Sequence, residues 1–341
     1  MPSNSCLDGF EFRADGFFFD EGGSPCVLVG TVEFTDFWNT FDACFSSPLG
    51  RKLIYAATDA EECHLSKTKQ AQFGKWFGRR RAEAFLNGRA ACMGWGFFQH
   101  RQIASPAHDA LTVGWMLAHQ EHLAQKRLAL EWRQPTNDQI ILTLSPNQQA
   151  MPPPPSVQPL AWLSSNGEEN HPSSLRSVDL DHRGTTLFAG QAKSFFLPVS
   201  VIQRLIDGLR GRPSMVNGPL SDWEFESSIE ESDLFKAVAH ASHVAYNNTD
   251  GPVYLQAADD WRGHLSLQFS DRGFGSVEVR QSILAGDDCT EFVVHSHLPA
   301  MVAGTVVGMW CRAHGHRGKV RCSLHDGCLN LTVRKPRMNY E

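Results

Sequence analysis

The sequence predicts an α+β protein built from two tandem copies of one domain, and two observations indicate this. First, the stretch that begins at Gly16 aligns without a gap with the stretch that begins at Gly184. Each reads as a glycine turn, an extended apolar run and an amphipathic helix with apolar residues at i, i+3, i+4 and i+7. Second, helices and antiparallel strand pairs occur in separate groups within each half, which is typical of α+β domains.

Further matches between the halves follow in one order. The anchors of the first helix are Phe34, Phe37, Trp38 and Phe41 in one half, and Ile202, Leu205, Ile206 and Leu209 in the other. Later matches pair Gly94-Trp95-Gly96 with Gly273-Phe274-Gly275, Pro106 and Gly114 with Pro299 and Gly308, and Leu142-Thr143-Leu144 with Leu331-Thr332-Val333. Four matches in the same order are harder to explain by chance than one, so we infer a duplication.

The remaining elements of each half are expected in the same order. Longer helices are predicted at 67–87 and 228–246, and helices that begin with proline at 106–124 and 299–312. Proline suits the first turn because its missing N–H would be unpaired there, and Ser105 is expected as an N-cap. Small residues on these two helices predict a face that another backbone approaches closely. Strand pairs at 128–133 with 139–144, and at 319–324 with 328–333, close the two halves.

A domain boundary is expected at residues 147–174, between a first copy at 1–146 and a second copy at 175–341. Four consecutive prolines at 152–155 cannot pair as a strand and favour a stiff, extended linker. Residues 160–163 are apolar, and we expect them to dock on a domain surface.

The composition is that of an ordinary globular protein, with 42% hydrophobic and 20% charged residues. A net charge of −6 gives no general electrostatic reason to bind nucleic acid or an anionic membrane. No stretch approaches the about 20 apolar residues of a membrane helix, and the N-terminus lacks the pattern of a signal peptide. Nine cysteines, an odd number, favour free thiols, so we expect a cytoplasmic protein.

The order of the motifs resembles the 4-vinyl-reductase, or hydrocarbon-binding, domain. The resemblance is carried by the Gly-rich starts, the Gly-aromatic-Gly runs, the helix with Gly304 and Gly308, and the final hairpin from Cys322 to Cys328. That domain is related to the sensor domain of aromatic-responsive bacterial activators and to a group of vesicle-trafficking adaptors. The resemblance implies an internal apolar pocket, pairing of the two copies as an intramolecular pseudo-dimer, and ligand binding in place of catalysis.

The sequence departs from the zinc-binding members of that family. Lys319 stands where those members place a glutamate before the first hairpin cysteine, and Pro299 stands where they have a cysteine. In the first half, Arg133 and Gln139 lie near the positions of the hairpin cysteines. The resemblance therefore implies no zinc site in the first half.

The second half nevertheless holds a dense group of metal-ligand residue types, and zinc takes four nitrogen or sulfur ligands. The candidate ligands are Cys311, His314, Cys322, His325 and Cys328, with His316 nearby. If Asp326-Gly327 forms a two-residue turn, His325 faces Cys328, and Cys322 points to the opposite, apolar side of the sheet. Two interpretations stay open: a zinc or haem site, or buried structural thiols with surface histidines.

Aromatic residues indicate a pocket for an apolar ligand, although core packing also explains them. The chain has 22 Phe and nine Trp but only four Tyr, and such side chains line sites for small apolar molecules. The candidate ligand-binding residues are Phe77, Trp95, Phe97, Phe98 and Phe274, with His100 as the polar group that orients the ligand.

Three functions are compatible with these patterns. The leading hypothesis is a cytoplasmic sensor, carrier or adaptor that binds a small hydrophobic or aromatic molecule, including a tetrapyrrole, and acts through a protein partner. The second is a metal- or haem-dependent enzyme that uses the Cys/His set of the second half. The third is a structural adaptor without a ligand. The sequence contains no nucleophile elbow, Walker loop or dinucleotide fingerprint.

Overall fold

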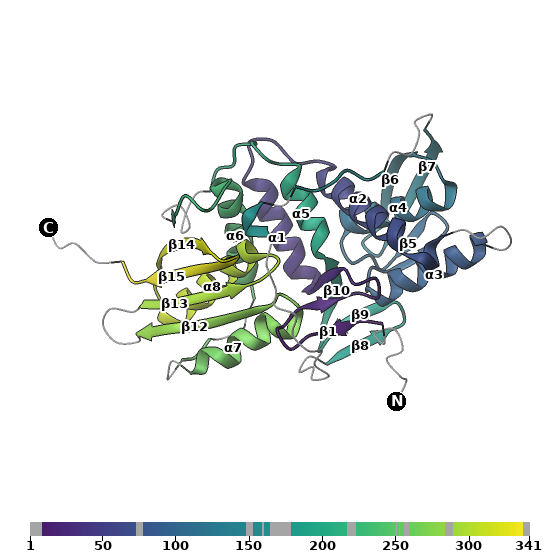
Figure 1. The fold of residues 1–341 in the computed structure, drawn as a ribbon. Helices are drawn as coiled ribbons and strands as arrows, with labels where there is room; N and C mark the ends of the chain where they lie inside the picture. The colour runs from purple at the N-terminus through teal and green to yellow at the C-terminus, as the bar shows by residue number, and fades with distance from the viewer. Residues whose placement is uncertain are drawn as a thin grey trace.

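The protein is described here by a computed structural model that covers residues 9–72, 78–147, 153–158, 160–163, 179–216, 223–249, 251, 253–255, 259–283 and 289–336. Helices and largely antiparallel sheets occupy this part of the chain, which confirms the predicted α+β class. Two sheets lie at opposite ends of the molecule, and helices α1 and α5 lie between them (Figure 1). None of the described helices combines the length and apolar composition that a membrane crossing requires.

The described elements of the two halves follow each other in nearly the same order. Before residue 147 they are β1 (Glu11–Phe12), β2 (Phe18–Phe19), β3 (Pro25–Gly30), α1 (Thr31–Ala43), α2 (Lys52–Lys67), α3 (Gly78–Cys92), β4 (Phe97–Gln99), β5 (Gln102–Ala104), α4 (Asp109–Ala124), β6 (Leu128–Thr136) and β7 (Gln139–Pro146). After residue 179 they are β8 (Leu180–Arg183), β9 (Thr186–Ala189), β10 (Ala192–Pro198), α5 (Val199–Asp207), β11 (Glu224–Phe225), α6 (Ser232–Asn247), α7 (Asp260–Gln268), β12 (Ser276–Ile283), β13 (Cys289–His295), α8 (Pro299–His314), β14 (Lys319–His325) and β15 (Cys328–Arg334).

The strands of the two halves are arranged in matching sheets. The first-half sheet has the order β4-β5-β7-β6, and the second-half sheet has the order β12-β13-β15-β14, to which β11 adds a parallel edge. A third sheet, β1-β2-β3-β10-β9-β8, takes its strands from both halves. At its centre β3 pairs antiparallel with β10, with Leu28 opposite Phe196.

Contacts across this central strand pair are reciprocal. The carbonyl of Leu28 accepts a hydrogen bond from Nε of Arg272 at 3.1 Å, so the second half contacts the first. The carbonyl of Phe196 accepts a hydrogen bond from Nε1 of Trp95 at 2.9 Å, so the first half contacts the second. Trp95 is the aromatic residue of the first Gly-aromatic-Gly run, and Arg272 directly precedes the second.

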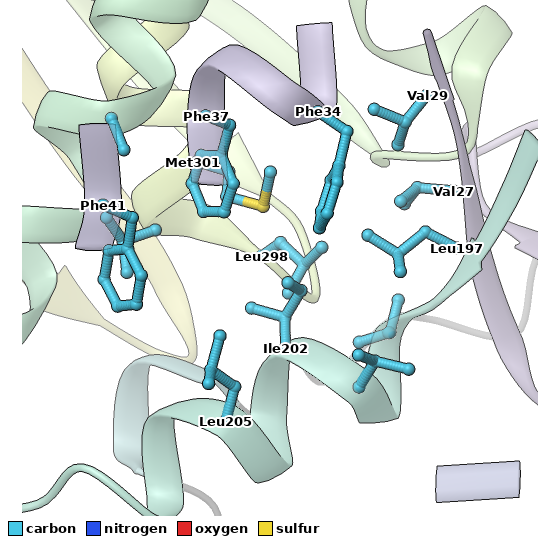
Figure 2. Packing of buried hydrophobic residues seen from close by; sticks show 14 of the residues in the cluster. Val27, Val29, Phe34, Phe37, Phe41, Leu197, Ile202, Leu205, Leu298 and Met301 are labelled. Carbon is cyan, nitrogen blue, oxygen red and sulfur yellow. The ribbon is translucent and has the colours of Figure 1, made fainter. Parts of the chain in front are cut away.

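The helices also cross between the halves. Helix α1 packs on α6, and α5 packs on α2, while α2 with α4 and α6 with α8 form the helix pairs within each half. Buried apolar residues of both halves therefore form one continuous core. In Figure 2, Phe34 and Phe41 of α1, Ile202 of α5 and Met301 of α8 surround the same interior.

Two glycines allow these helix pairs to approach closely, as the small-residue faces predict. Gly114 is the sixth residue of α4 and Gly304 the sixth of α8. A Cβ atom at Gly304 would lie 1.9 Å from the carbonyl oxygen of Ala239, and one at Gly114 would lie 2.4 Å from that of Ile54. Gly114 and Gly304 thus hold the same position in their helices, counted from the first residue, whereas Gly308 lies one turn later in α8.

Several predicted boundaries are corrected by the structure. The helix predicted at 67–87 does not exist as one helix, because α2 ends at Lys67 and α3 begins at Gly78. Helix α4 begins at Asp109, with His108 as its N-cap, whereas Ser105 has a positive φ of 51°. Helix α6 and the two closing strand pairs confirm the prediction with small shifts of their ends.

The described parts of the expected linker lie against the second half. A 3-10 helix at Ala161–Leu163 buries Trp162, whose Nε1 donates a hydrogen bond to the carbonyl of Glu230 at 2.9 Å. Its indole ring meets Phe235 edge to face, with 5.1 Å between the ring centroids. This confirms the predicted docking of residues 160–163.

Candidate functional site

An apolar pocket lies where α1 of the first half meets α6 and α8 of the second half, and we call it the junction pocket. Its lining residues are Val29, Glu33, Phe34, Phe37, Ser242, Ala245, Gln268, Phe269, Phe274, Met301, Val302 and Thr305. Figure 2 shows Met301 beside Phe34 and Phe37. The pocket therefore needs both halves to be complete.

The junction pocket is small. Its internal volume is about 20 Å³, which is enough for about one water molecule. Arg272 forms an ion pair with Glu33 of the pocket lining and thereby joins the two halves. The hydroxyl of Ser242 in the lining is buried and has no hydrogen-bond partner among the described residues.

Two tryptophans pack against each other in the core of the first half. Trp95 and Trp115 stack with their ring centroids 4.0 Å apart, and both are fully buried. Trp115 is the seventh residue of α4, and Thr305 is the seventh of α8. Phe274 holds the place of Trp95 in the second Gly-aromatic-Gly run. Phe274 and Thr305 are smaller than these tryptophans, and both line the junction pocket.

The structure separates the predicted ligand-binding residues. Phe274 lines the junction pocket, whereas Trp95 and Phe98 are buried in the core of the first half. Phe97 is 44% exposed, and His100 is exposed in the turn that joins β4 to β5. Phe77 lies outside the described residues. Of the described candidates, Phe274 alone lines the junction pocket.

The predicted metal ligands are not brought together either. The described residues contain no group of three or more His, Cys, Asp or Glu that could hold a metal ion. Cys322 is fully buried opposite Leu331, whereas His325 is exposed and faces Cys328 across the Asp326–Gly327 turn. This register confirms the predicted turn and places Cys322 and Cys328 on opposite sides. His314 instead stacks on Trp310 with 4.2 Å between the ring centroids, and Cys311 lies half-buried in α8.

Cys328 contacts a histidine that is not among the predicted metal ligands. Its Sγ lies 3.2 Å from Nδ1 of His295 on the neighbouring strand. Burial raises the pKa of the Cys328 thiol, and the charge of Asp326 raises it further. A thiol with a raised pKa is a poor nucleophile at neutral pH, so this pair does not form an activated cysteine.

A buried charge network in the first half was not predicted. Arg89 of α3 binds Glu61 of α2 at 2.9 Å and Asp20 at 3.0 Å, and Glu61 also contacts Nε2 of His119 at 3.1 Å. His64 lies 3.5 Å from Asp20. All five side chains are at least nine-tenths buried. Their positions in the sequence carry no motif, because the turn after β2 and helices α2, α3 and α4 each contribute separately.

The network shifts the pKa values of its own carboxyl and imidazole groups. Burial alone would raise the pKa of Glu61, but Arg89 and His119 outweigh it and hold that pKa far below its usual value. Burial lowers the pKa of His119, and burial together with Arg89 lowers the pKa of His64. The network therefore favours an ionised carboxylate at Glu61 and neutral imidazoles at His64 and His119.

Comparison with family models, with curated proteins and with solved structures finds no match to this chain. The functional argument therefore rests on the residues themselves. Two features call for explanation: the junction pocket with its unpartnered hydroxyl, and the buried charge network beside α2.

The stability of the protein is expected to fall as the pH decreases from about 6.5 to 4. Burial lowers the pKa of His108 and of His243 to about 4, from an ordinary value of 6.5. The folded state keeps both imidazoles neutral while the unfolded chain takes up protons, so acid favours unfolding. Each histidine should contribute a loss on the order of 2 kcal/mol. Urea denaturation at pH 7, 5.5 and 4 measures this loss.

Two variants distinguish the effect of the two histidines on stability from that of Glu62, whose ionisation changes stability with pH in the opposite direction. Burial raises the pKa of Glu62 to about 7, with help from Glu121 and against the effect of Arg127. Ionisation of Glu62 thus destabilises the fold as the pH rises from 4.5 to 7. Glu62→Gln should steepen the acid loss, and the double variant His108→Gln/His243→Gln should flatten it. Parallel pH profiles for all three proteins would contradict this assignment.

Proposed function

We propose that the protein binds a small apolar or aromatic molecule in the junction pocket and acts as a sensor, carrier or adaptor in the cytoplasm. The observation that carries the proposal is a lining of Phe, Val and Met side chains around one buried hydroxyl, that of Ser242, without a partner. Ligand sites typically combine an apolar wall with a few polar groups that orient the ligand. The free thiols among the described cysteines support a reducing compartment.

We further propose that the chain is a tandem duplication whose copies, 1–146 and 175–341, form an intramolecular pseudo-dimer. The matching strand orders β4-β5-β7-β6 and β12-β13-β15-β14 support this. The backbone pairing of Leu28 with Phe196 supports it as well, since these two residues match in the alignment of the halves and a two-fold relation would exchange them. In this arrangement each copy places its first helix on the core of the other.

The pocket size restricts the ligand. A volume of about 20 Å³ requires that side chains move before anything larger than water enters. Met301 is the side chain best suited to move, because methionine is unbranched and flexible. We therefore propose a ligand of the size of benzene or indole and not a tetrapyrrole.

Indole is expected to raise the melting temperature of the protein by about 2 °C at ten times its dissociation constant, because it binds only the folded state. Thr305→Met should abolish the shift by filling the pocket. Phe274→Ala should enlarge the pocket and strengthen binding, although it lowers the melting temperature without ligand. Differential scanning calorimetry with and without indole measures all three.

The matched control is Leu267→Met, which introduces the same side chain at a position of α7 that is 61% exposed. This variant should keep the full response to indole. The proposal is contradicted if neither the natural chain nor Phe274→Ala responds to indole or benzene.

A structural adaptor without a ligand is the second candidate. The small pocket volume and the continuous core of buried apolar residues favour it. A pseudo-dimer of this kind would present its outer surface to a protein partner. If neither the natural chain nor Phe274→Ala binds apolar probes, the result supports the structural adaptor.

A further inference from the structure

Strand β12 forms a free edge of the second-half sheet. The sheet has the order β11-β14-β15-β13-β12, and no described strand pairs with the outer side of β12. In Figure 1, β12 is the lowest strand of this sheet, and α7 runs below it. The 8 residues of this edge offer backbone N–H and C=O groups with which another strand can pair.

An open groove of about 550 Å³ follows this edge. Its lining consists of residues 277–282 of β12 together with Asp259, Trp261, Arg262 and Leu265 of α7 and its N-cap. Trp261 meets the buried ring of Phe292 on β13 edge to face, with 5.2 Å between the ring centroids. Helix α7 therefore packs on the core side of the sheet, and the groove leaves the length of β12 accessible beside it.

The charges along the groove favour a partner that carries both signs. Two anions, Asp259 and Glu278, and two cations, Arg262 and Arg280, line it. A strongly acidic or strongly basic peptide would therefore meet repulsion as well as attraction. Within β12, the exposed side chains of Glu278 and Arg280 flank Val279. A strand of the same sequence that runs in the opposite direction presents the complementary order of charges, so β12 of a second copy fits this edge.

Glu278 and Arg280 lie on the same face of the sheet. Burial and Asp326 raise the pKa of the Cys328 thiol, and the charges of Arg280 and Glu278 also act on that pKa. Both charged groups therefore lie near Cys328, which is on the outer face. Side chains that stand opposite each other on paired strands share a face. Glu278 of one copy can thus contact Arg280 of the other.

A two-fold axis at Val279 brings these charges together. This axis places Glu278 of each copy opposite Arg280 of the other and gives two pairs of opposite charge. An axis at Glu278 or at Arg280 would instead place two like charges opposite each other, which is destabilising. The charges therefore select the register that is centred on Val279.

The bulge of β12 is compatible with this register. It adds one residue to the strand between Val279 and Gln281. With this extra residue in both copies, Val277 stands opposite Ser282 of the other copy. These two residues share the core face, because their partners on β13 are buried. Charges and bulges can protect an edge strand from pairing, but here the charges repel only in the other registers.

The other long edge strand, β6, is less accessible to a second strand. Its exposed charges Glu131 and Arg133 have the same spacing as those of β12. However, Nη1 of Arg51 donates a hydrogen bond to the carbonyl of Leu130 at 3.1 Å, and Pro135 has no N–H to donate. Both features hinder the addition of a strand at β6.

We propose that two copies of this chain associate through β12, which pairs antiparallel with β12 of the second copy and joins their second-half sheets. Two ion pairs between Glu278 and Arg280 across the two-fold axis fix the register. The association is independent of the proposed ligand binding, because the groove and the junction pocket share no lining residue.

Sedimentation velocity of the full chain over a range of concentrations tests the proposal. A contact along one strand edge is small, so we expect a dissociation constant of about 10–100 μM. The measured mass should rise from 38.0 kDa toward that of two chains. A chain that stays monomeric at about 500 μM overturns the proposal.

Charge reversal tests the register. Glu278→Arg and Arg280→Glu should each raise the dissociation constant by about tenfold or more, because like charges then face each other. An equal mixture of the two variants should associate as tightly as the natural chain, since the cations of one variant face the anions of the other. The double variant Glu278→Arg/Arg280→Glu should likewise restore association. A mixture that associates no better than either variant alone overturns the proposal.

Glu131→Arg is the matched control, because it reverses an exposed charge on β6, the other long edge. This variant should leave the dissociation constant unchanged. Loss of association in Glu131→Arg would place the contact at β6 and show that the proposal is wrong.

Discussion

Replacing Gly304 by alanine is expected to destabilise the protein by about 3 kcal/mol, although alanine is the better helix former. A Cβ atom at this position would lie 1.9 Å from the carbonyl oxygen of Ala239, and the carbonyl carbon and Cα of that residue are also within 3 Å. These are backbone atoms of α6, so the clash cannot be relieved by a side-chain rotation. Helices α6 and α8 must move apart and lose packing on both sides.

Gly88→Ala is the matched control for Gly304→Ala. Gly88 lies in α3, is exposed, and has no atom within 4 Å of the place where a Cβ would stand. This substitution should therefore stabilise the protein by about 0.5–1 kcal/mol through helix propensity alone. Equilibrium urea denaturation of both variants gives the comparison. Similar unfolding free energies for the two variants would contradict the close approach of the helices.

Replacing Arg89 by methionine is expected to cost about 3–5 kcal/mol. The guanidinium is the cation that compensates Glu61 and Asp20, and all three side chains are at most 3% exposed. Methionine fills a similar volume but leaves two carboxylates in the interior without a positive charge. The loss should be smaller at pH 4 than at pH 7, because protonation removes the uncompensated charges.

Two further variants make the Arg89 prediction specific. Arg80→Met changes an exposed arginine of the same helix and should alter stability by less than about 0.5 kcal/mol. Adding Glu61→Gln and Asp20→Asn to Arg89→Met should restore part of the stability, because neutral amides replace the unpaired charges. A loss below about 1 kcal/mol for Arg89→Met, or no recovery in the triple variant, would show that the network is not held by this ion pair.

The parts of the fold that follow from local chemistry could be predicted from the sequence. The Asp326–Gly327 turn sets the register of β14 and β15, and the side-chain alternation then places Cys322 inside. The apolar stripe of Phe34, Phe37 and Phe41 likewise marks the buried face of α1. Each of these features depends on residues close together in the chain.

Helix α2 could not be predicted because it is buried on several sides. Its buried residues include Leu53, Ala57 and Thr58, but also Glu61 and His64, so its apolar residues do not form a single stripe. Charged side chains in the interior appear in a sequence as ordinary surface positions. Their role emerges only when the turn after β2 and helices α3 and α4 bring compensating groups to them.

The candidate sites were equally hidden from sequence reasoning. The junction pocket is lined by α1 of the first half and by α6 and α8 of the second half. Its lining residues are therefore far apart in the sequence. Aromatic content indicated a pocket, but Trp95 and Phe98 are buried in the core of the first half, whereas Phe274 and Thr305 line the junction pocket. A comparison of the two halves at equivalent helix positions is the signal that could have found it.

The pairing of β3 with β10 has a consequence for biosynthesis. Strand β3 ends at Gly30, yet its central partner spans Ala192–Pro198, so a ribosome must translate most of the chain before that partner emerges. Until then the nascent first half carries an unpaired strand edge and an exposed apolar helix, features that invite aggregation. We therefore expect the shared sheet to form only late in synthesis or after release of the chain.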